Sequence, residues 1–221
     1  MYGWAIAQAK IHDGQEMKVT KAQAQANRAH VVETASALFR ERGYDGVGVA
    51  DLMAAAGFTH GGFYKHFHSK ADLMAETAAC AIAQASAQTA ELDTSEFVHY
   101  YLSRAHRDAR ATGCTFAALG GDAARQPEAV QAKFAAGVES MLAALSHQDA
   151  KVDSADASQT RAASLDLLAH VIGAVVMSRA CPNNSPLADE ILTICRDKIL
   201  ASLNMPGSTP VPMHDGTTSH S

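Results

Sequence analysis

The sequence predicts an all-α protein. Alanine dominates the apolar residues, which make up 48% of the 221 residues, whereas aromatic side chains account for only 6%. Alanine has the highest helix propensity, and runs of the β-branched residues that favour strands are few. Apolar residues also recur at spacings of three and four, the period of a helix with one buried face. A chain of this length can form one large domain, or a small domain joined to a larger one.

The first part of the chain predicts a helix over 27–42 followed by a shorter one. The first helix ends at Gly43, a residue that tolerates the left-handed conformation common at helix C-termini. Its apolar stripe consists of Val31, Ala35, Leu38 and Phe39. The second stripe ends at Gly57 and consists of Val49, Leu52, Met53 and Ala56. Both stripes have the helical period, so both segments are expected to bury one face.

A third short helix is expected directly after a tight, glycine-containing turn. Thr59 offers a hydroxyl as its N-cap, and Phe63 and Phe67 anchor it at i, i+4. Ser69 then caps a fourth helix, with Asp72 at the N3 position of a shortened capping box. Three compact helices with a tight turn before the last have the geometry of a helix-turn-helix.

Charge is distributed unevenly along the chain, although the net charge is −5. Residues 17–70 hold seven basic and four acidic side chains, whereas residues 71–221 hold ten basic and 17 acidic ones. A mildly basic first part followed by an acidic remainder suits contact with a polyanion through the first part. Chance segregation of solvated surface charges is the alternative interpretation.

The third helix combines glycines with polar side chains, which suits a helix that lies in the major groove of DNA. Gly61 and Gly62 remove side chains that would hold the backbone away from the duplex, at a cost of roughly 1 kcal/mol each relative to alanine. The polar groups then available to the duplex are Thr59, His60, Tyr64, Lys65 and His66. Lys70, at the start of the next helix, can pair with a phosphate. A surface helix with a hydrophilic face would show the same spacing.

The stretch "NRAHVVETASALFRERGYDGVGVADLMAAAGFTHGGFYKHFHSKADL" resembles the N-terminal DNA-binding domain of TetR-family transcriptional regulators. It follows their succession of "LFxERG", "AxxAGxxxGxxYxHF" and "SK" elements, with Met53 in place of the first alanine of the second element. The resemblance implies that DNA is contacted by Arg28, Thr59, His60, Gly61, Tyr64, Lys65, His66 and Lys70. His60 replaces a long residue common in the family, and Gly62 replaces a Ser or Thr, so the operator sequence does not carry over. The family usually starts near Met17 of this chain.

The remainder of the chain predicts a larger helical domain that matches the family in layout rather than in motif. Helices are expected over 71–92, 95–112, from 113 onward, from Pro127 to about 146, 159–179 and 187–203. A polar linker spans 147–158. The domains are therefore predicted as an N-terminal, flexible extension (1–24), a helix-turn-helix domain (25–70), an effector-binding and dimerisation domain (71–205) and a disordered tail (206–221).

The last two predicted helices are strongly apolar and indicate a partner surface. Their apolar residues include Leu165, Leu168, Ile172, Val175 and Val176 in the first helix, and Ile191, Leu192, Ile194, Ile199 and Leu203 in the second. Burial in a single core would explain them equally well. The resemblance implies that these helices pair with their copies in a homodimer that reads two half-sites of double-stranded operator DNA.

The resemblance also implies a cavity for a small-molecule effector of unknown identity. Aromatic, flexible or polar residues suited to line it are Tyr100, Tyr101, Cys114, Phe116, Phe134, Met141, His170 and Met177. Cys114 follows the helix-breaking Gly113 at a helix start, where backbone N–H groups stabilise a thiolate. It is therefore a candidate sensor of an oxidant or electrophile. The alternative is an inert, buried thiol, which the sequence favours because Arg110 is the closest basic residue along the chain.

Other functional classes find less support in the sequence. GxSxG, phosphate-loop and HExxH patterns are absent, so we expect no enzyme, no catalytic residues, no cofactor and no metal. The four cysteines are widely spaced, which suits reduced thiols. A membrane span and a cleavable leader are not expected, so the protein is predicted to be a cytoplasmic DNA-binding repressor. A helical interaction module without DNA binding is the remaining alternative.

Overall fold

The structure, a computed structural model, describes residues 20–149 and 157–203, and every regular element in these ranges is a helix. The elements are α1 (Lys21–Arg42), α2 (Val49–Ala55), the 3₁₀ helix η1 (His60–Lys65), α3 (Lys70–Thr89), α4 (Thr94–Tyr101), α5 (Arg104–Asp108), α6 (Thr115–Ala123), α7 (Glu128–Asp149), α8 (Ala157–Ala180) and α9 (Pro186–Leu203). The predicted all-α class is confirmed. The predictions for residues 1–19, for most of the linker and for the tail lie outside the described residues.

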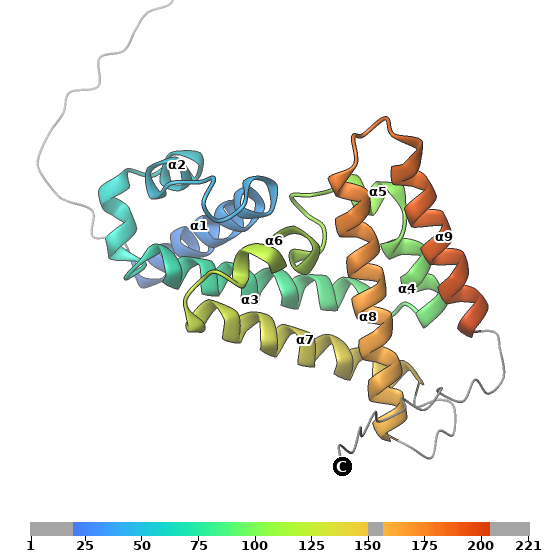
Figure 1. Cartoon of the computed structure of the whole chain (residues 1–221). Coiled ribbons are helices and arrows are strands. Elements are labelled where there is room, and N and C mark those ends of the chain that lie inside the picture. Colours follow the sequence, from blue (N-terminus) through green and yellow to red (C-terminus); the bar gives the residue numbers. More distant parts are fainter. Residues whose placement is uncertain (1–19, 150–156, 204–221) are drawn as a thin grey trace, which may run out of the picture.

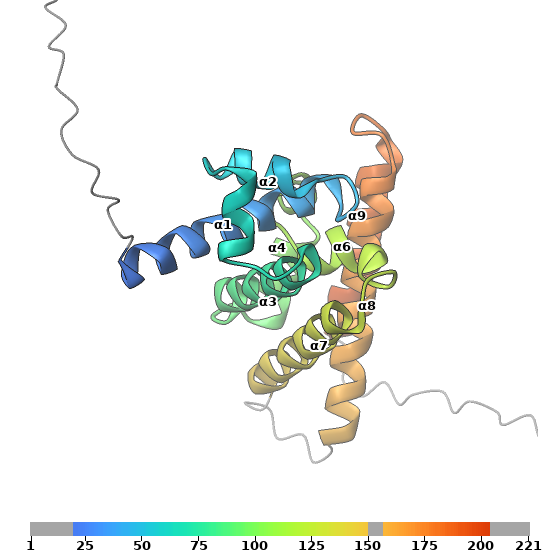
Figure 2. The same ribbon diagram turned by 90° about the vertical axis from the view of Figure 1, so that its left-hand side faces the viewer.

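The helices form two groups connected by α3 (Figure 1). We call α1, α2 and η1 the head, and α4 to α9 the body. The long helix α3 starts beneath the head and runs into the body, where it packs along α7. Helices α8 and α9 pack against each other at the opposite side of the body (Figure 2). The head and the α8–α9 pair therefore occupy different ends of the molecule.

The predicted apolar stripes of the head are buried. Val31, Ala35 and Phe39 of α1 are buried, as are Leu52 and Met53 of α2. Two of the predicted caps also form: Gly43 has φ +77° at the end of α1, and Ser69 Oγ accepts a hydrogen bond from Asp72 N at 3.1 Å. Thr59 is the N-cap residue of η1, but its hydroxyl accepts no capping hydrogen bond. The Asp72 carboxylate accepts from His68 N rather than from Ser69 N, so the capping box is displaced by one residue.

The structure corrects two boundaries in the head. Helix α1 begins at Lys21 because the Thr20 hydroxyl caps it by accepting from Gln23 N at 3.2 Å. Residues 21–24 therefore belong to the first helix and not to the predicted flexible extension. The third helix is a 3₁₀ turn, with Gly62 N donating to Thr59 O at 2.9 Å. The low helix propensity of two successive glycines is consistent with this tighter, shorter form.

The hydrophobic core of the head continues into the body. The cluster that contains Phe39, Phe63 and Phe67 also contains residues of α6 and α7. These body residues are Leu119, Ala123, Val130 and Phe134, all of them buried. Burial of apolar surface is the main favourable term in folding. The head is thus stabilised by contact with the body as well as by its own helices.

A second core lies within the body, and its helices differ in one respect from the prediction. The helix expected over 95–112 is broken into α4 and α5 at Leu102 and Ser103. Ser103 is the N-cap of α5, and its hydroxyl accepts from His106 N at 3.1 Å. A serine competes with the helical backbone for hydrogen bonds, which favours a helix start at this position. The remaining body helices lie close to the predicted ranges.

A buried arginine connects α5 to the end of α8. Arg107 is 1% exposed, and its guanidinium donates to Ser178 Oγ at 3.0 Å and to the Ser178 carbonyl at 2.9 Å. It also donates to Asn183 Oδ1 at 3.0 Å and to Asp108 Oδ1. These hydrogen bonds satisfy a buried charge and fix the loop between α8 and α9 against α5.

Replacing Arg107 with methionine is therefore expected to destabilise the fold. The substitution leaves the Ser178 and Asn183 acceptors without their donor, and we expect the free energy of unfolding to fall by about 3 kcal/mol. Urea denaturation followed by circular dichroism measures this change. Arg104→Met, which removes an exposed arginine next to the same loop, is the matched control and should cost much less. Equal losses for the two variants would show that burial of Arg107 is not the cause.

Candidate nucleic-acid interface and adjoining cavity

The head presents a polar, exposed surface on η1 that is anchored from below by two aromatic rings. Phe63 and Phe67 are buried, with ring centroids 5.4 Å apart. On the outer side, Tyr64 is 65% exposed, and His60 and Lys65 are exposed beside it. The burial of the two phenylalanines fixes the orientation of the helix and directs these polar residues to solvent. Thr59 and Gly61 are exposed on the same segment, whereas His66 is half-buried.

Two of the predicted DNA-contacting residues already have partners within the protein. Arg28 forms an ion pair with Glu76, donates to His66 O at 3.3 Å and lies 4.7 Å from the Phe67 ring centroid. It therefore connects α1 to α3 and to the end of η1. Lys70 donates to the Tyr44 carbonyl, which places its ammonium on the loop after α1. Both side chains are half-buried, and each holds the head together in addition to any contact with a phosphate.

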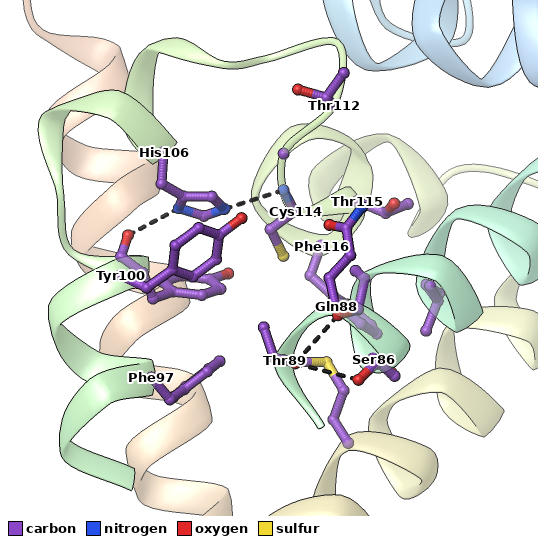
Figure 3. Close-up of a pocket in the computed structure, with 15 residues that line it drawn as sticks. Ser86, Gln88, Thr89, Phe97, Tyr100, His106, Thr112, Cys114, Thr115 and Phe116 are labelled. Atoms are coloured by element: carbon purple, nitrogen blue, oxygen red, sulfur yellow. Dashed lines mark hydrogen bonds between the residues drawn. The ribbon is translucent and has the colours of Figure 1, made fainter. Parts of the chain in front are cut away.

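A small cavity lies in the body between α3, α4, α6 and α7 (Figure 3). Its free volume is about 30 Å³, enough for roughly two water molecules. The aromatic side chains Phe97, Tyr100, Tyr101 and Phe116 supply much of its lining. The remaining lining residues are Ile82, Ala85, Ser86, Gln88, Thr89, His106, Thr112, Gly113, Cys114, Thr115 and Met141.

Five of the eight residues predicted for an effector pocket meet at this cavity: Tyr100, Tyr101, Cys114, Phe116 and Met141. Three predicted positions do not. Phe134 packs edge-on behind Phe116, with ring centroids 5.5 Å apart, and belongs to the core shared with the head. His170 and Met177 lie on exposed positions of α8, Met177 being 60% exposed. Neither residue lines this cavity; His170 borders a separate hollow beside Lys198 and Leu203 of α9, and the effector pocket stays a prediction.

His106 contributes to the cavity although its sequence position gave no sign of it. Its Nε2 accepts from Cys114 N at 3.3 Å, so Nδ1 carries the proton and donates to Tyr101 O at 2.8 Å. Both ring nitrogens are thus used by the neutral form. Burial lowers the pKa of His106, and the positive charge of Arg179 lowers it further, against the opposing hydrogen bond to Tyr101 O. Such a contact between α5 and the start of α6 depends on the fold and has no local sequence signal.

Cys114 is the N-cap residue of α6, as predicted, and it has basic neighbours that are distant in sequence. The guanidiniums of Arg40 and Arg179 both lie within electrostatic reach of its thiol. Burial lowers the pKa of each arginine, and the interaction with Cys114 opposes that shift. The sequence favoured an inert, buried thiol because no basic residue lies close along the chain; the fold brings two arginines near Cys114 and also buries it.

The segment 111–122 contacts the head at both ends, and its first residues also border the cavity. Arg40 Nε of α1 donates to Ala111 O at 2.6 Å. At the far end of α6, Asp122 Oδ2 accepts from Tyr44 N at 3.0 Å. A Cβ atom on Gly43 would lie 2.7 Å from the same carboxylate oxygen, so this contact requires glycine there. A displacement of α6 therefore acts directly on the loop that follows α1.

Comparison with known proteins identifies the head and the fold. Residues 31–77 match the family described as bacterial regulatory proteins, tetR family. The chain is 39% identical over 57 residues to the HTH-type transcriptional regulator AcrR of Shigella flexneri, which covers 26% of each chain. It is 51% identical over 43 residues to the HTH-type transcriptional repressor DhaR of a Mycobacterium strain, covering 20% of this chain and 22% of DhaR. The matches thus span about a quarter of the length of these curated relatives.

Solved structures resemble the chain over most of its length. A TetR transcriptional regulator from Chloroflexus aurantiacus has a TM-score of 0.66 at 22% identity, covering 82% of this chain and 96% of that one. The reduced form of E. coli NemR has a TM-score of 0.64 at 19% identity, covering 79% of this chain and 95% of NemR. At these identities the likeness establishes the shared fold.

The environment of His106 predicts that acid destabilises the protein. An unfolded histidine binds a proton with a pKa of about 6.5, whereas the pKa of folded His106 is lower. The unfolded state therefore takes up more protons as the pH falls through this region, and the free energy of unfolding should decrease from pH 7.5 to pH 5.5. Urea titrations at both pH values measure the change. This decrease should be smaller in His106→Gln and should be retained in His99→Gln, the control at an exposed histidine. The same decrease in the parent protein and both variants would show that His106 is not its cause.

Proposed function

Because the chain belongs to the tetR family of bacterial regulatory proteins, we propose that it is a cytoplasmic transcriptional repressor rather than an enzyme. In this proposal it binds double-stranded operator DNA as a homodimer, and a small-molecule effector releases it. The observation that carries the proposal is the exposed face of η1. Its polar side chains point outward while Phe63 and Phe67 hold it rigidly on the head.

The exposed face of η1 has the chemistry that a DNA groove requires. Lys65 can donate to the acceptors of a guanine, and Tyr64 and His60 can contact bases or phosphates beside it. A Cβ atom on Gly61 would meet nothing within 4 Å, so the glycine leaves open space on this side. Thr59 and His66 flank the same face, and Lys70 is placed to pair with a phosphate from its position beside Tyr44.

The dimer surface we propose is the outer face of α8 and α9. Large apolar side chains stand exposed there: Leu165, Val176, Met177, Leu187, Ile194 and Leu203. By length and mean hydropathy alone, the stretch Ser158–Ala180 could cross a membrane. Its opposite stripe, with Leu168, Val171 and Val175, is buried in the body, which favours a second protein copy as the cover of the exposed face. Two heads would then reach two half-sites.

The effector in this proposal acts through the cavity and α6. A free volume of about 30 Å³ is too small for a drug-sized molecule, so binding must displace neighbouring segments. The segment 111–122 lines the cavity and holds Arg40 and Tyr44 of the head. Its displacement would change the spacing of the two heads and lower operator affinity. An oxidant or electrophile that modifies Cys114 would act at the same place, since Cys114 starts α6.

Lys65→Ala should weaken binding to the operator without changing stability. We expect a loss of about tenfold or more on operator DNA and a smaller loss on random duplex, because a base contact is removed from an exposed position. Mobility-shift titrations with the DNA upstream of the protein's own coding sequence, at two salt concentrations, measure both affinities. Lys133→Ala, an exposed lysine of α7, is the matched control. Equal operator affinity of the parent protein, Lys65→Ala and Lys133→Ala would contradict the proposed DNA-reading face.

Cys114→Ser should abolish operator release by thiol reagents if Cys114 is the sensor. Hydrogen peroxide or iodoacetamide would be added to the preformed operator complex, and the fraction of bound DNA measured over time. Variants in which Cys80, Cys181 or Cys195 is replaced by serine should respond like the parent protein. Release of Cys114→Ser at the parental rate would show that the effector acts without modifying this thiol.

A further inference from the structure

The wall of the cavity contains hydroxyl groups without partners. Among the described residues, Thr115 Oγ1 and Ser86 Oγ are buried without a hydrogen-bond partner, and Tyr101 Oη has only the thiol of Cys114, a weak partner, beside it. Tyr101 is 3% exposed and Thr115 is 2% exposed, and all three residues line the cavity. Buried polar groups in folded proteins are almost always hydrogen-bonded, to protein or to ordered water. Two unpartnered hydroxyls, and a third that meets only a thiol, therefore indicate that the occupant of the cavity supplies hydrogen-bonding atoms.

The electrostatics of the cavity favour some occupants over others. None of its fifteen lining residues is a lysine, arginine, aspartate or glutamate. His106 is held in its neutral form by the Cys114 and Tyr101 backbone. The nearest positive charges are Arg40 and Arg179, which lie within electrostatic reach of Cys114 at one end. A cation in the cavity would lose its hydration without a carboxylate to replace it, and it would be repelled by both arginines.

The lining also constrains the shape of the occupant. The rings of Phe97, Tyr101 and Phe116 favour a flat, aromatic molecule. Met141, a flexible side chain, lines both this cavity and a neighbouring space of about 20 Å³, as do Ser86, Thr89 and Phe97. Tyr100 is half-exposed, with its ring 5.3 Å from that of His106 (Figure 3). Rotation of Met141 and Tyr100 would enlarge the cavity without unfolding a helix.

We propose that the cavity binds an aromatic molecule that carries a hydrogen-bond acceptor and no positive charge, such as an aryl ketone, and excludes cations of the same shape. The carbonyl oxygen accepts from the hydroxyls of Tyr101 and Thr115, and the ring lies among the aromatic side chains. In the empty cavity, ordered water can take the place of the carbonyl oxygen. The regulatory meaning of this site rests on the proposed function, whereas binding itself is independent of DNA.

Three small probes of matched shape test the proposal on the full-length chain. Acetophenone has the carbonyl, ethylbenzene replaces it with a methylene, and 1-phenylethylamine places a cation there at pH 7. Isothermal titration calorimetry gives the three dissociation constants. We expect acetophenone to bind about tenfold more tightly than ethylbenzene, and the amine to bind more weakly than either. Equal or tighter binding of the amine, or no binding of acetophenone at millimolar concentration, would overturn the proposal.

Isosteric variants connect the preference to the hydroxyls. Tyr101→Phe and Thr115→Val should each bring the affinity for acetophenone close to that for ethylbenzene, while ethylbenzene binding stays unchanged. Thr89→Val is the matched control, because Thr89 also lines the cavity but its hydroxyl already donates to Ala85 O at 3.1 Å. A loss of acetophenone affinity in Thr89→Val as large as in Thr115→Val would contradict the assignment of the donors.

The experiments test the ligand class and the repressor function independently of each other. If the protein binds acetophenone as expected but does not bind operator DNA, the ligand class stands and the repressor function falls. If it binds operator DNA but shows no preference for the ketone over ethylbenzene, the function stands and the ligand class falls.

Discussion

The hydrophobic core that the head shares with the body is the constraint on which the rest of the structure depends. Phe39, Phe63 and Phe67 pack in one cluster with Leu119 of α6 and Phe134 of α7. The orientation of η1 is therefore fixed partly by helices that also border the cavity. If the head and the body had separate cores joined by a flexible connection, a displacement of the body helices would not move the head. Here the buried contacts themselves transmit it, because a close-packed core transmits strain.

Polar contacts at the same boundary also attach the body to the head. The Asp122 carboxylate accepts from Tyr44 N, and Arg40 donates to Ala111 O, so both ends of the segment 111–122 are attached to the head. Burial, together with the negative charge of Asp122, raises the pKa of Tyr44, which is consistent with a tightly enclosed loop after α1. The cavity borders the first part of this segment, and the contact with Tyr44 lies at its other end.

Much of the fold could be predicted from local sequence, and most of the cavity chemistry could not. Ser69 and Gly43 marked helix ends because caps are set by neighbouring residues, and the stripe of Val31, Ala35 and Phe39 gave the buried face of α1. The placement of Arg40 and Arg179 around Cys114 had no such signal, because it depends on how distant helices pack. His170 and Met177 do not line this cavity, and the sequence of an apolar helix does not reveal which of its sides faces the core. The polar role of Thr115 likewise depends on what surrounds its hydroxyl.

The shared core also has a consequence for the synthesis of the protein. The ribosome releases the head first, and N-terminal units generally begin to fold as they emerge. This head, however, obtains Leu119, Ala123, Val130 and Phe134 only after a much longer stretch of chain has been made. A nascent or truncated chain that ends before α7 would expose the underside of Phe39 and Phe63 and hold η1 loosely. Only a chain that already carries its body would present a firmly oriented η1.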